Sequence, residues 1–210
     1  MSDSKSKDET VKIAKKYGAK IVLGPKKGPG YARNLGAKIA KGDILLFLDA
    51  DVILPKKDIL SHIIKILKEE KDVVGGTSTF RAHGANEKEK KIFSFASNLL
   101  KLLYKLNTVG VIPGHFIFVR KNIFKKVNGF DEELPYCEDH DFAAKIKKYG
   151  KLKIINGNVL VSTRRLKVNG FEKTLKEYMI PTFYYIVNKR YVKQKFEFKP
   201  ASDLEDNKQK

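Results

Sequence analysis

Two aspartates, Asp49 and Asp51, have the spacing in this sequence that most directly suggests chemistry. They follow the apolar run 44–48 and are separated by a single alanine. A short apolar run between turn signals is typical of a strand buried on both faces of an α/β sheet. Carboxylates at the end of such a strand lie where open α/β sheets bind ligands, and two of them can hold a hard divalent cation. The pair predicts a cation site, although two solvent-exposed aspartates in a loop that bind no ligand would give the same sequence pattern.

Two other clusters have residue types that would complete such a site. Residues 30–36 read Gly-Tyr-Ala-Arg-Asn-Leu-Gly, and residues 138–141 read Glu-Asp-His-Asp. A basic residue such as Arg33 beside a cation-binding carboxylate pair suits a nucleotide diphosphate, because cation and arginine together offset the phosphate charge. Glu138 and Asp139, at the start of a predicted helix, could supply a general base for an acceptor. Acidic residues are also common at helix N-termini for structural reasons alone.

The elements that must position these clusters alternate between helix and strand along the chain. This alternation, with short connections, predicts an α/β fold built on a doubly wound sheet. The turn dipeptide Asn156-Gly157 predicts a β-hairpin between strands 151–155 and 158–162. The expected helices cover residues 9–17, 31–40, 57–71, 87–106, 121–127, 142–149 and 170–192, and the other expected strands cover 19–23, 44–48, 72–80 and part of 109–119.

Composition describes a globular protein with an unusual charge. The 210 residues are 42% hydrophobic and 32% charged, which is enough for a core and argues against wholesale disorder. The formal net charge is +19 and comes mainly from lysines spread along the helices. Nucleic-acid binders more often concentrate arginine and aromatic residues in one patch. Nucleic acid is therefore the less favoured partner, while phospholipid headgroups or a phosphorylated substrate remain open.

Cysteine content and hydropathy bear on the compartment. Cys137 is the single cysteine, so the chain has no internal disulfide, as is typical of a reducing cytosol. The polar opening 1–10 does not resemble a signal peptide, and no apolar run reaches the length of about 18 residues that a spanning helix needs. We expect a cytoplasmic protein without a transmembrane segment, and contact with a membrane surface stays open.

The order and spacing of these motifs resemble those of family 2 glycosyltransferases. The matching segments are residues 28–36, 44–51, 129–132 and 138–141, and residues 3–10 resemble a further segment of that family. The resemblance covers roughly residues 3 to 165. It implies the GT-A fold, a Rossmann-like mixed sheet flanked by helices. It also implies a metal-dependent, inverting transfer of a sugar from a nucleotide-diphosphate donor to an acceptor.

The resemblance also assigns expected roles by position. Asp3 and Arg33 would help bind the nucleotide, and Asp49 would contact the nucleotide or the metal. Asp51 would ligate Mn²⁺ or Mg²⁺ bridging the diphosphate. Asp139 would be the base that deprotonates the acceptor hydroxyl. The residues expected on the acceptor side are Gly114, His115 and Glu138.

One departure from the family concerns the start of the chain. The family normally has a strand, a helix and a second strand before the segment that matches Asp3. Without them the sheet would have unpaired edges, so we expect Met1 to be internal to a longer natural protein. Residues 1–192 are expected to form one catalytic domain, with a nucleotide-binding part at 1–55 and an acceptor-side part at 56–192. Residues 193–210 are expected to be a disordered polar tail.

Two alternatives to sugar transfer remain at this point. Residues 46–51 also resemble the first motif of haloacid-dehalogenase-type phosphatases, in which Asp49 would be the nucleophile. That family usually has a threonine soon after the pair, where this chain has Val52-Ile-Leu54. The third reading is a non-catalytic basic module that binds nucleic acid or an anionic membrane. The sequence does not name the acceptor, and its basic surface and apolar helices make a lipid-linked acceptor a hypothesis.

Overall fold

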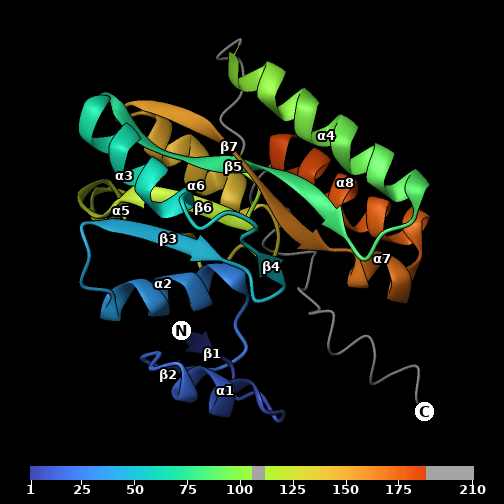
Figure 1. Cartoon of the computed structure of the whole chain (residues 1–210), viewed down its shortest axis with the longest axis horizontal. Helices are drawn as coiled ribbons and strands as arrows, with labels where there is room; N and C mark the ends of the chain where they lie inside the picture. Colours follow the sequence, from blue (N-terminus) through green and yellow to red (C-terminus); the bar gives the residue numbers. More distant parts are fainter. Residues whose placement is uncertain (106–111, 188–210) are drawn as a thin grey trace.

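Two separate sheets organise the computed structural model, which describes residues 1–105 and 112–187 (Figure 1). The larger is a five-stranded mixed sheet with the order β3–β6–β5–β7–β4. The smaller pairs β1 with β2 in parallel and lies with α1 beneath α2. The strands are β1 (Ser2–Asp3), β2 (Val22–Leu23), β3 (Ile44–Leu48), β4 (Val52–Ile53), β5 (Val73–His83), β6 (Phe116–Arg120) and β7 (Lys151–Ser162).

Helices cover both faces of the larger sheet and define two cores. On one face, α2 (Pro29–Ile39) and α6 (Glu138–Lys147) enclose a cluster that includes Phe130 and Phe142, whose rings stack with centroids 4.2 Å apart. On the other face, α3 (Ile59–Glu69) packs its apolar stripe on Phe116 and Phe118. The remaining helices are α1 (Thr10–Lys16), α4 (Glu87–Lys105), α5 (Lys121–Lys126), α7 (Arg164–Asn169) and α8 (Phe171–Val187).

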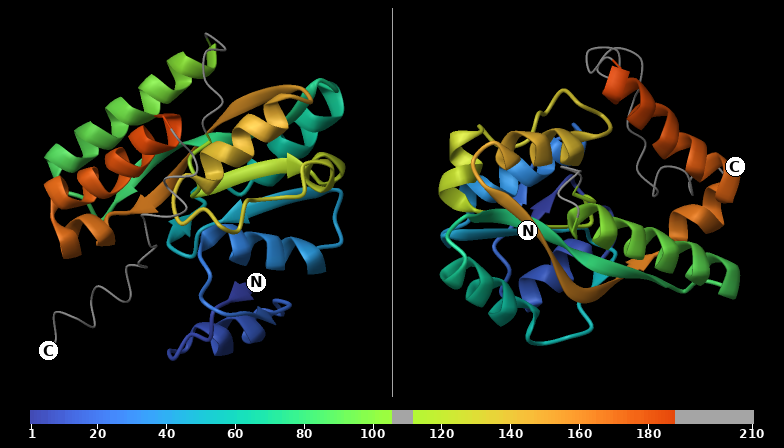
Figure 2. Two further views of the ribbon diagram at one scale, coloured as in Figure 1. Left: turned by 180° about the vertical axis from the view of Figure 1, so that it is seen from behind. Right: turned by 90° about the horizontal axis from the view of Figure 1, so that it is seen from above.

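The predicted class, α/β with a mixed sheet flanked by helices, is confirmed. Helices α4, α7 and α8 gather at one end of the larger sheet, away from the β1–β2 sheet, in Figure 1 and in the rear view of Figure 2. Within the described residues, no helix combines the length and the apolarity needed to cross a membrane. The predicted polar tail 193–210 and the last residues of the predicted helix 170–192 lie outside the described part of the chain.

The prediction for β3 is confirmed in its bounds and wrong in its burial. Only Leu45 is buried, and Leu48 is 42% exposed. The reason is position, since β3 is the first strand of the five-stranded order and, among the described strands, pairs with β6 alone. Antiparallel pairing places Leu48 opposite Phe116, which brings the end of β3 beside the turn at Gly114 and His115.

The predicted hairpin around Asn156-Gly157 is wrong. Residues 151–162 form one strand, β7, which runs parallel to β5 along its length. The turn dipeptide falls within an irregularity in the pairing between Ser78 and Phe80, where Asn158 adopts a left-handed φ of 49°. The Thr79 hydroxyl accepts a hydrogen bond from the Asn158 N–H at 2.9 Å. The dipeptide that predicted a turn therefore lies in a β-bulge, and the strand continues through it.

Candidate functional site

Arg33 joins four segments of the chain at the carboxyl end of β3. Its side chain, 11% exposed, comes from the first half of α2. Nη1 donates to Glu138 Oε1 at 2.5 Å, while Nη2 donates to Asp49 Oδ1 and to the Gly114 carbonyl, both at 3.1 Å. The guanidinium carbon lies 5.4 Å from the centroid of the Phe130 ring. A single arginine therefore brings together residues that are far apart in the sequence.

The charges of this cluster shift one another's protonation. Burial opposes the charge of Arg33, but the carboxylates of Asp49, Glu138 and Asp139 outweigh it and raise the pKa of the guanidinium. Burial raises the pKa of Glu138 to about 7; the charge of Asp139 adds to the rise, and Arg33 opposes it. Burial also raises the pKa of Asp49, with Arg33 opposing and the charges of Asp51 and Asp139 adding to the effect. Strongly shifted pKa values in one cluster of charged groups are typical of functional sites.

Asp139 lies beside Arg33 and the turn before β6. A Cβ built on Gly114 would stand 3.1 Å from Asp139 Oδ2 and 2.8 Å from Arg33 Nη2, so the turn approaches both groups closely. The other oxygen, Oδ1, accepts the N–H of His140 at 2.8 Å. Helix α6 begins at Glu138, four residues earlier than predicted, so both acids lie in its first turn. Both therefore face the same cluster from one helix start.

His115 contributes a neutral imidazole to the same place. Burial lowers its pKa to about 4; the charge of Asp139 opposes this shift, and Arg33 adds to it. Its ring meets Phe80 edge to face at 4.9 Å. Nε2 is buried without a hydrogen-bond partner among the described residues. A buried, unsatisfied ring nitrogen next to a carboxylate is available for a ligand hydroxyl.

Asn34 is a residue whose role the sequence did not reveal. Its amide donates to the Phe130 carbonyl and to Glu132 Oε1, both at 2.9 Å, and its Oδ1 accepts the Phe130 N–H at 2.9 Å. A Cβ on Gly129 would stand 2.4 Å from Asn34 Oδ1, so glycine is needed there. These hydrogen bonds hold the motif of residues 30–36 against the motif of residues 129–132. The presence of both motifs in the sequence was the only indication that they would be in contact.

Asp3 and Asp51 occupy different positions relative to this cluster. Asp51 is exposed in the turn after β3, and its charge acts on Asp49. Asp3 is buried in β1, where its carboxylate accepts the backbone N–H of Ser6 at 2.9 Å and the Ser6 hydroxyl at 2.5 Å. The structure therefore brings together Arg33, Asp49, Gly114, His115, Glu138 and Asp139, places Asp51 at their edge, and holds Asp3 in the smaller sheet.

The donor set at the end of β3 fits a hard divalent cation that shares its ligands with a substrate. Asp49 is bonded to Arg33 through one oxygen and is 43% exposed, and Asp51 is exposed. No group of three or more potential metal-ligating side chains converges within residues 1–105 and 112–187. Mg²⁺ is commonly held by only one or two carboxylates, with phosphate oxygens completing its shell. Two carboxylates therefore suffice for a cation that arrives with a diphosphate.

Curated relatives of the chain are glycosyltransferases. It is 31% identical over 176 residues to an uncharacterized glycosyltransferase of Rickettsia prowazekii, covering 76% of this chain and 52% of that protein. It is 25% identical over 170 residues to the rhamnosyltransferase WbbL of Escherichia coli, covering 72% and 64%. The chain thus spans between about half and two thirds of the length of these two relatives.

Solved structures share the fold of the chain. The mannosyltransferase PcManGT of Pyrobaculum calidifontis, in complex with GDP-Man and Mn²⁺, superposes with a TM-score of 0.60 at 17% identity, over 91% of this chain and 59% of that one. S. aureus TarS in complex with UDP-GlcNAc gives 0.63 at 20% identity, over 97% and 59%. These likenesses establish the GT-A fold.

The family itself follows from the sequence. The description of glycosyl transferase family 2 matches residues 1–127, which include α2, β3 and the pair Asp49 and Asp51. The matched range holds two of the motifs on which the resemblance was based, residues 28–36 and 44–51, and the expected family is confirmed. The chain belongs to glycosyl transferase family 2.

Proposed function

We propose that the chain transfers a sugar from a nucleotide-diphosphate donor to an acceptor hydroxyl, with inversion and with help from Mn²⁺ or Mg²⁺. The observation that carries this proposal is the convergence of Arg33, Asp49, Gly114 and Asp139 at the end of β3. Family membership argues against the phosphatase alternative, and the related structures with GDP-Man and UDP-GlcNAc support a nucleotide sugar as donor.

Asp49 and Asp51 are the proposed ligands of the cation. When bound, the cation would offset the diphosphate charge as the leaving group departs. Arg33 holds Asp49 in place through its 3.1 Å hydrogen bond and adds positive charge on the donor side. The donor-binding role of Asp3 is indirect in this proposal, because its carboxylate already accepts two hydrogen bonds from Ser6 and shapes the loop there.

Asp139 is the proposed general base. It would take the proton of the acceptor hydroxyl while that oxygen forms a bond to the anomeric carbon and the bond to the diphosphate oxygen breaks, so the configuration inverts. The neutral His115 would orient the acceptor through its unsatisfied Nε2, and Gly114 would leave room for it. Glu138 would act through Arg33 rather than by touching the acceptor, because its carboxylate is buried against the guanidinium.

The acceptor and the division of the chain remain parts of the proposal. The basic charge favours an acceptor with an anionic or lipid-linked portion. Residues 1–55 would bind the nucleotide and residues 56–192 would face the acceptor. In this division Arg33 and Asp49 belong to the first part and Asp139 belongs to the second.

A thermal-shift panel tests the donor site. The chain is heated with UDP-GlcNAc, UDP-glucose and GDP-mannose, with and without Mn²⁺, because a ligand of the folded state raises the unfolding temperature. We expect one donor to stabilise the chain in a Mn²⁺-dependent way, and Asp51→Ala to lose the Mn²⁺-dependent part. Asp58→Ala is the matched control, since Asp58 is exposed nearby at the start of α3.

The role of Asp139 is tested separately from donor binding. Asp139→Asn should keep the donor-induced stabilisation and lose turnover of the donor by at least about a hundredfold, the lower range for a general base. Turnover retained in Asp139→Asn would refute the base assignment. Stabilisation retained in Asp51→Ala would refute the cation site.

A further inference from the structure

Helix α4 is apolar on two faces, and the elements described within residues 1–105 and 112–187 cover only one of them. On the covered face, Leu100 is buried, Phe93 meets Phe80 of β5 edge to face, and the Ser97 hydroxyl accepts the Phe80 N–H at 3.1 Å. On the other face the exposed side chains follow the i, i+4, i+7 spacing of a single stripe. They are Phe95, which is 70% exposed, Leu99 and Leu102. A second apolar stripe on a helix indicates a second partner.

Helix α8 also has one side packed against the protein and an exposed apolar stripe on the other side. Its inner side is tied to α6, where the Tyr185 hydroxyl lies 3.3 Å from Asp141 Oδ1. Its outer side carries an exposed stripe at i, i+3 and i+7, formed by Ile180, Phe183 at 63% exposure, and Val187. Both helices lie at the same end of the larger sheet (Figure 2). Two separate helices therefore expose the same kind of stripe at one end of the molecule.

Each stripe is preceded by two lysines on the same helical face. Lys88 and Lys91 stand seven and four residues before Phe95, and Lys173 and Lys176 stand seven and four residues before Ile180. All four are exposed and form no ion pair within the described residues. Elsewhere on α4, Lys90 does pair with Glu87 at 2.6 Å. The two stripes with their lysines are called the α4/α8 surface below.

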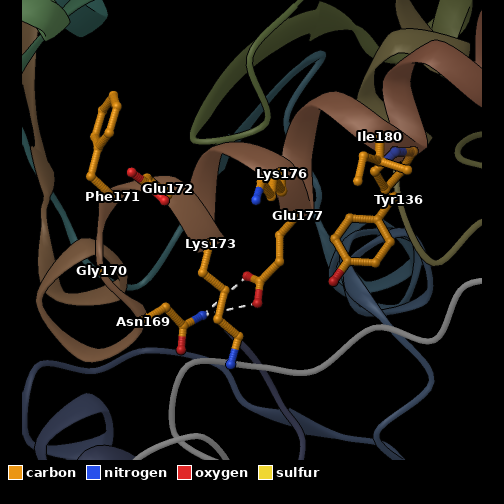
Figure 3. A pocket seen from close by; sticks show the side chains of 10 residues that line it. Tyr136, Asn169, Gly170, Phe171, Glu172, Lys173, Lys176, Glu177 and Ile180 are labelled. Carbon is orange, nitrogen blue, oxygen red and sulfur yellow. Dashed lines mark hydrogen bonds between the residues drawn. The ribbon is translucent and has the colours of Figure 1, made fainter.

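A cavity of 740 Å³ opens beside the lysines of α8 (Figure 3). Its lining combines Lys173 and Lys176 with the apolar side chains of Ile180 and Phe171 and the ring of Tyr136. Glu172 and Glu177 also line it; the Glu172 carboxylate is exposed, and the Glu177 carboxylate accepts the Asn169 amide, at 3.1 Å to each oxygen. Free ammonium groups above an apolar lining suit a phosphate headgroup and the first carbons of an acyl chain.

We propose that the α4/α8 surface lies on an anionic phospholipid bilayer, with the apolar stripes in the headgroup region and the lysines facing lipid phosphates. Basic helices with an apolar face bind membranes in this orientation, through buried apolar area and attraction to anionic lipid. A second copy of the chain fits less well, because two surfaces rimmed by unpaired lysines, on chains of charge +19, would repel. The proposal does not depend on sugar transfer.

Vesicle flotation tests the proposal. The chain is mixed with vesicles of phosphatidylcholine alone or of phosphatidylcholine with phosphatidylglycerol, and the floating fraction is measured. We expect binding to the anionic vesicles and weakening of that binding by added salt. Phe95→Ser combined with Phe183→Ser should weaken it at least about tenfold, as expected when large apolar side chains no longer enter the bilayer.

Two comparisons control the experiment. Tyr17→Ser removes a side chain that is 83% exposed directly after α1, a helix that lies far from α4 and α8 in Figure 1, and should leave vesicle binding unchanged. Changing Lys88, Lys91, Lys173 and Lys176 to Gln should abolish the preference for anionic vesicles. The altered side chains are exposed, so thermal unfolding of each variant should match the parent chain.

Several results would overturn the proposal. Failure of the parent chain to float with either vesicle type would show that the surface has no affinity for lipid, and equal flotation with both types would remove the role of the lysines. Equal binding by the double serine variant would place the contact elsewhere. A dimer in light scattering that the double serine variant dissociates would assign the α4/α8 surface to a second copy of the chain.

Discussion

The site around Arg33 and the α4/α8 surface use charge in opposite ways. In the site, the guanidinium is buried and bonded to Glu138, Asp49 and the Gly114 carbonyl. On the α4/α8 surface, four exposed lysines have no acidic partner among the described residues and adjoin exposed apolar side chains. Charges that are satisfied internally fix geometry, which a reaction centre needs. Charges left to solvent are available to an external partner. The predictions below test this contrast, beginning with the largest effect.

Removing the buried cation should be far more damaging than removing an exposed one. Arg33→Met leaves the buried Glu138 without its partner, and breaking a buried pair in this way typically costs about 3–5 kcal/mol. Lys90→Met breaks the exposed pair with Glu87 on α4, and such pairs contribute about 0–1 kcal/mol. Urea denaturation of both variants measures the difference in the free energy of unfolding.

A double variant separates the loss of the pair from other effects of the methionine. Arg33→Met with Glu138→Gln removes the unpaired carboxylate, so it should recover part of the stability lost in Arg33→Met. Equal losses in Arg33→Met and Lys90→Met would show that the buried cluster does not fix the geometry of the site.

Close packing around Gly114 should make the site intolerant of a single methyl group. Gly114→Ala places a Cβ 2.8 Å from Arg33 Nη2, and Arg33 cannot yield because three acceptors hold it. Overpacking of this kind costs about 1–3 kcal/mol. Donor turnover should fall more steeply than stability, since Asp139 Oδ2 lies on the same side at 3.1 Å. Turnover and thermal unfolding are measured on the same preparation.

Gly36→Ala provides the matched control on the helix that carries Arg33. A Cβ there would meet Ser2 Cβ at 3.7 Å, an ordinary van der Waals contact. Alanine is favoured over glycine inside a helix by up to about 1 kcal/mol, so this variant should be as stable as the parent chain or more so. If Gly114→Ala left turnover unchanged, the turn would accommodate a Cβ without displacing Arg33 or Asp139, and the close packing described here would be wrong.

The last prediction concerns a pair of opposite pH dependences. The pKa of Glu138 is raised from 4.5 to about 7, so its ionisation costs stability as the pH rises through that window. The pKa of His115 is lowered from 6.5 to about 4, so its contribution is complete above 6.5 and is lost as the pH falls toward 4. Relative to the parent chain, Glu138→Gln should therefore become more stable as the pH rises, and His115→Asn should become less stable.

Unfolding temperatures recorded across this pH range give the two difference curves. Arg33, Asp49 and Asp139 surround both groups in parent and variants alike, so taking differences removes most of their contribution. Difference curves with the same sign would show that at least one of the two groups is not buried as described.

Local patterns predicted most of the elements, whereas pairing between distant segments was harder to predict. The apolar run 44–48 gave β3 with its bounds, and helical spacing gave α3. The same kind of local signal failed at Asn156-Gly157, because pairing with β5 holds residues 151–162 in one strand. It also missed β4, whose two residues have their partner in β7, more than a hundred positions away.

The candidate site was predictable in its members and not in its contacts. Asp49, Arg33 and Asp139 could be singled out because residue types and motif order indicate them. That Glu138 is held by Arg33, or that Asn34 fastens the loop at Phe130, depends on a packing of α2 against α6 that no local pattern contains. The sequence therefore indicated which residues are candidates for the site, and the fold determines the distances between them.

The position of β3 has a consequence for the behaviour of concentrated solutions. It is the first strand of the five-stranded sheet and is made of five consecutive apolar residues, so within the described chain one of its edges offers main-chain groups to any extended segment. Mutual repulsion between highly cationic molecules keeps such edges apart in dilute salt. Because ions screen that repulsion, the tendency of the chain to aggregate through β3 should increase as ionic strength rises. Low ionic strength should therefore favour storage of the protein in solution.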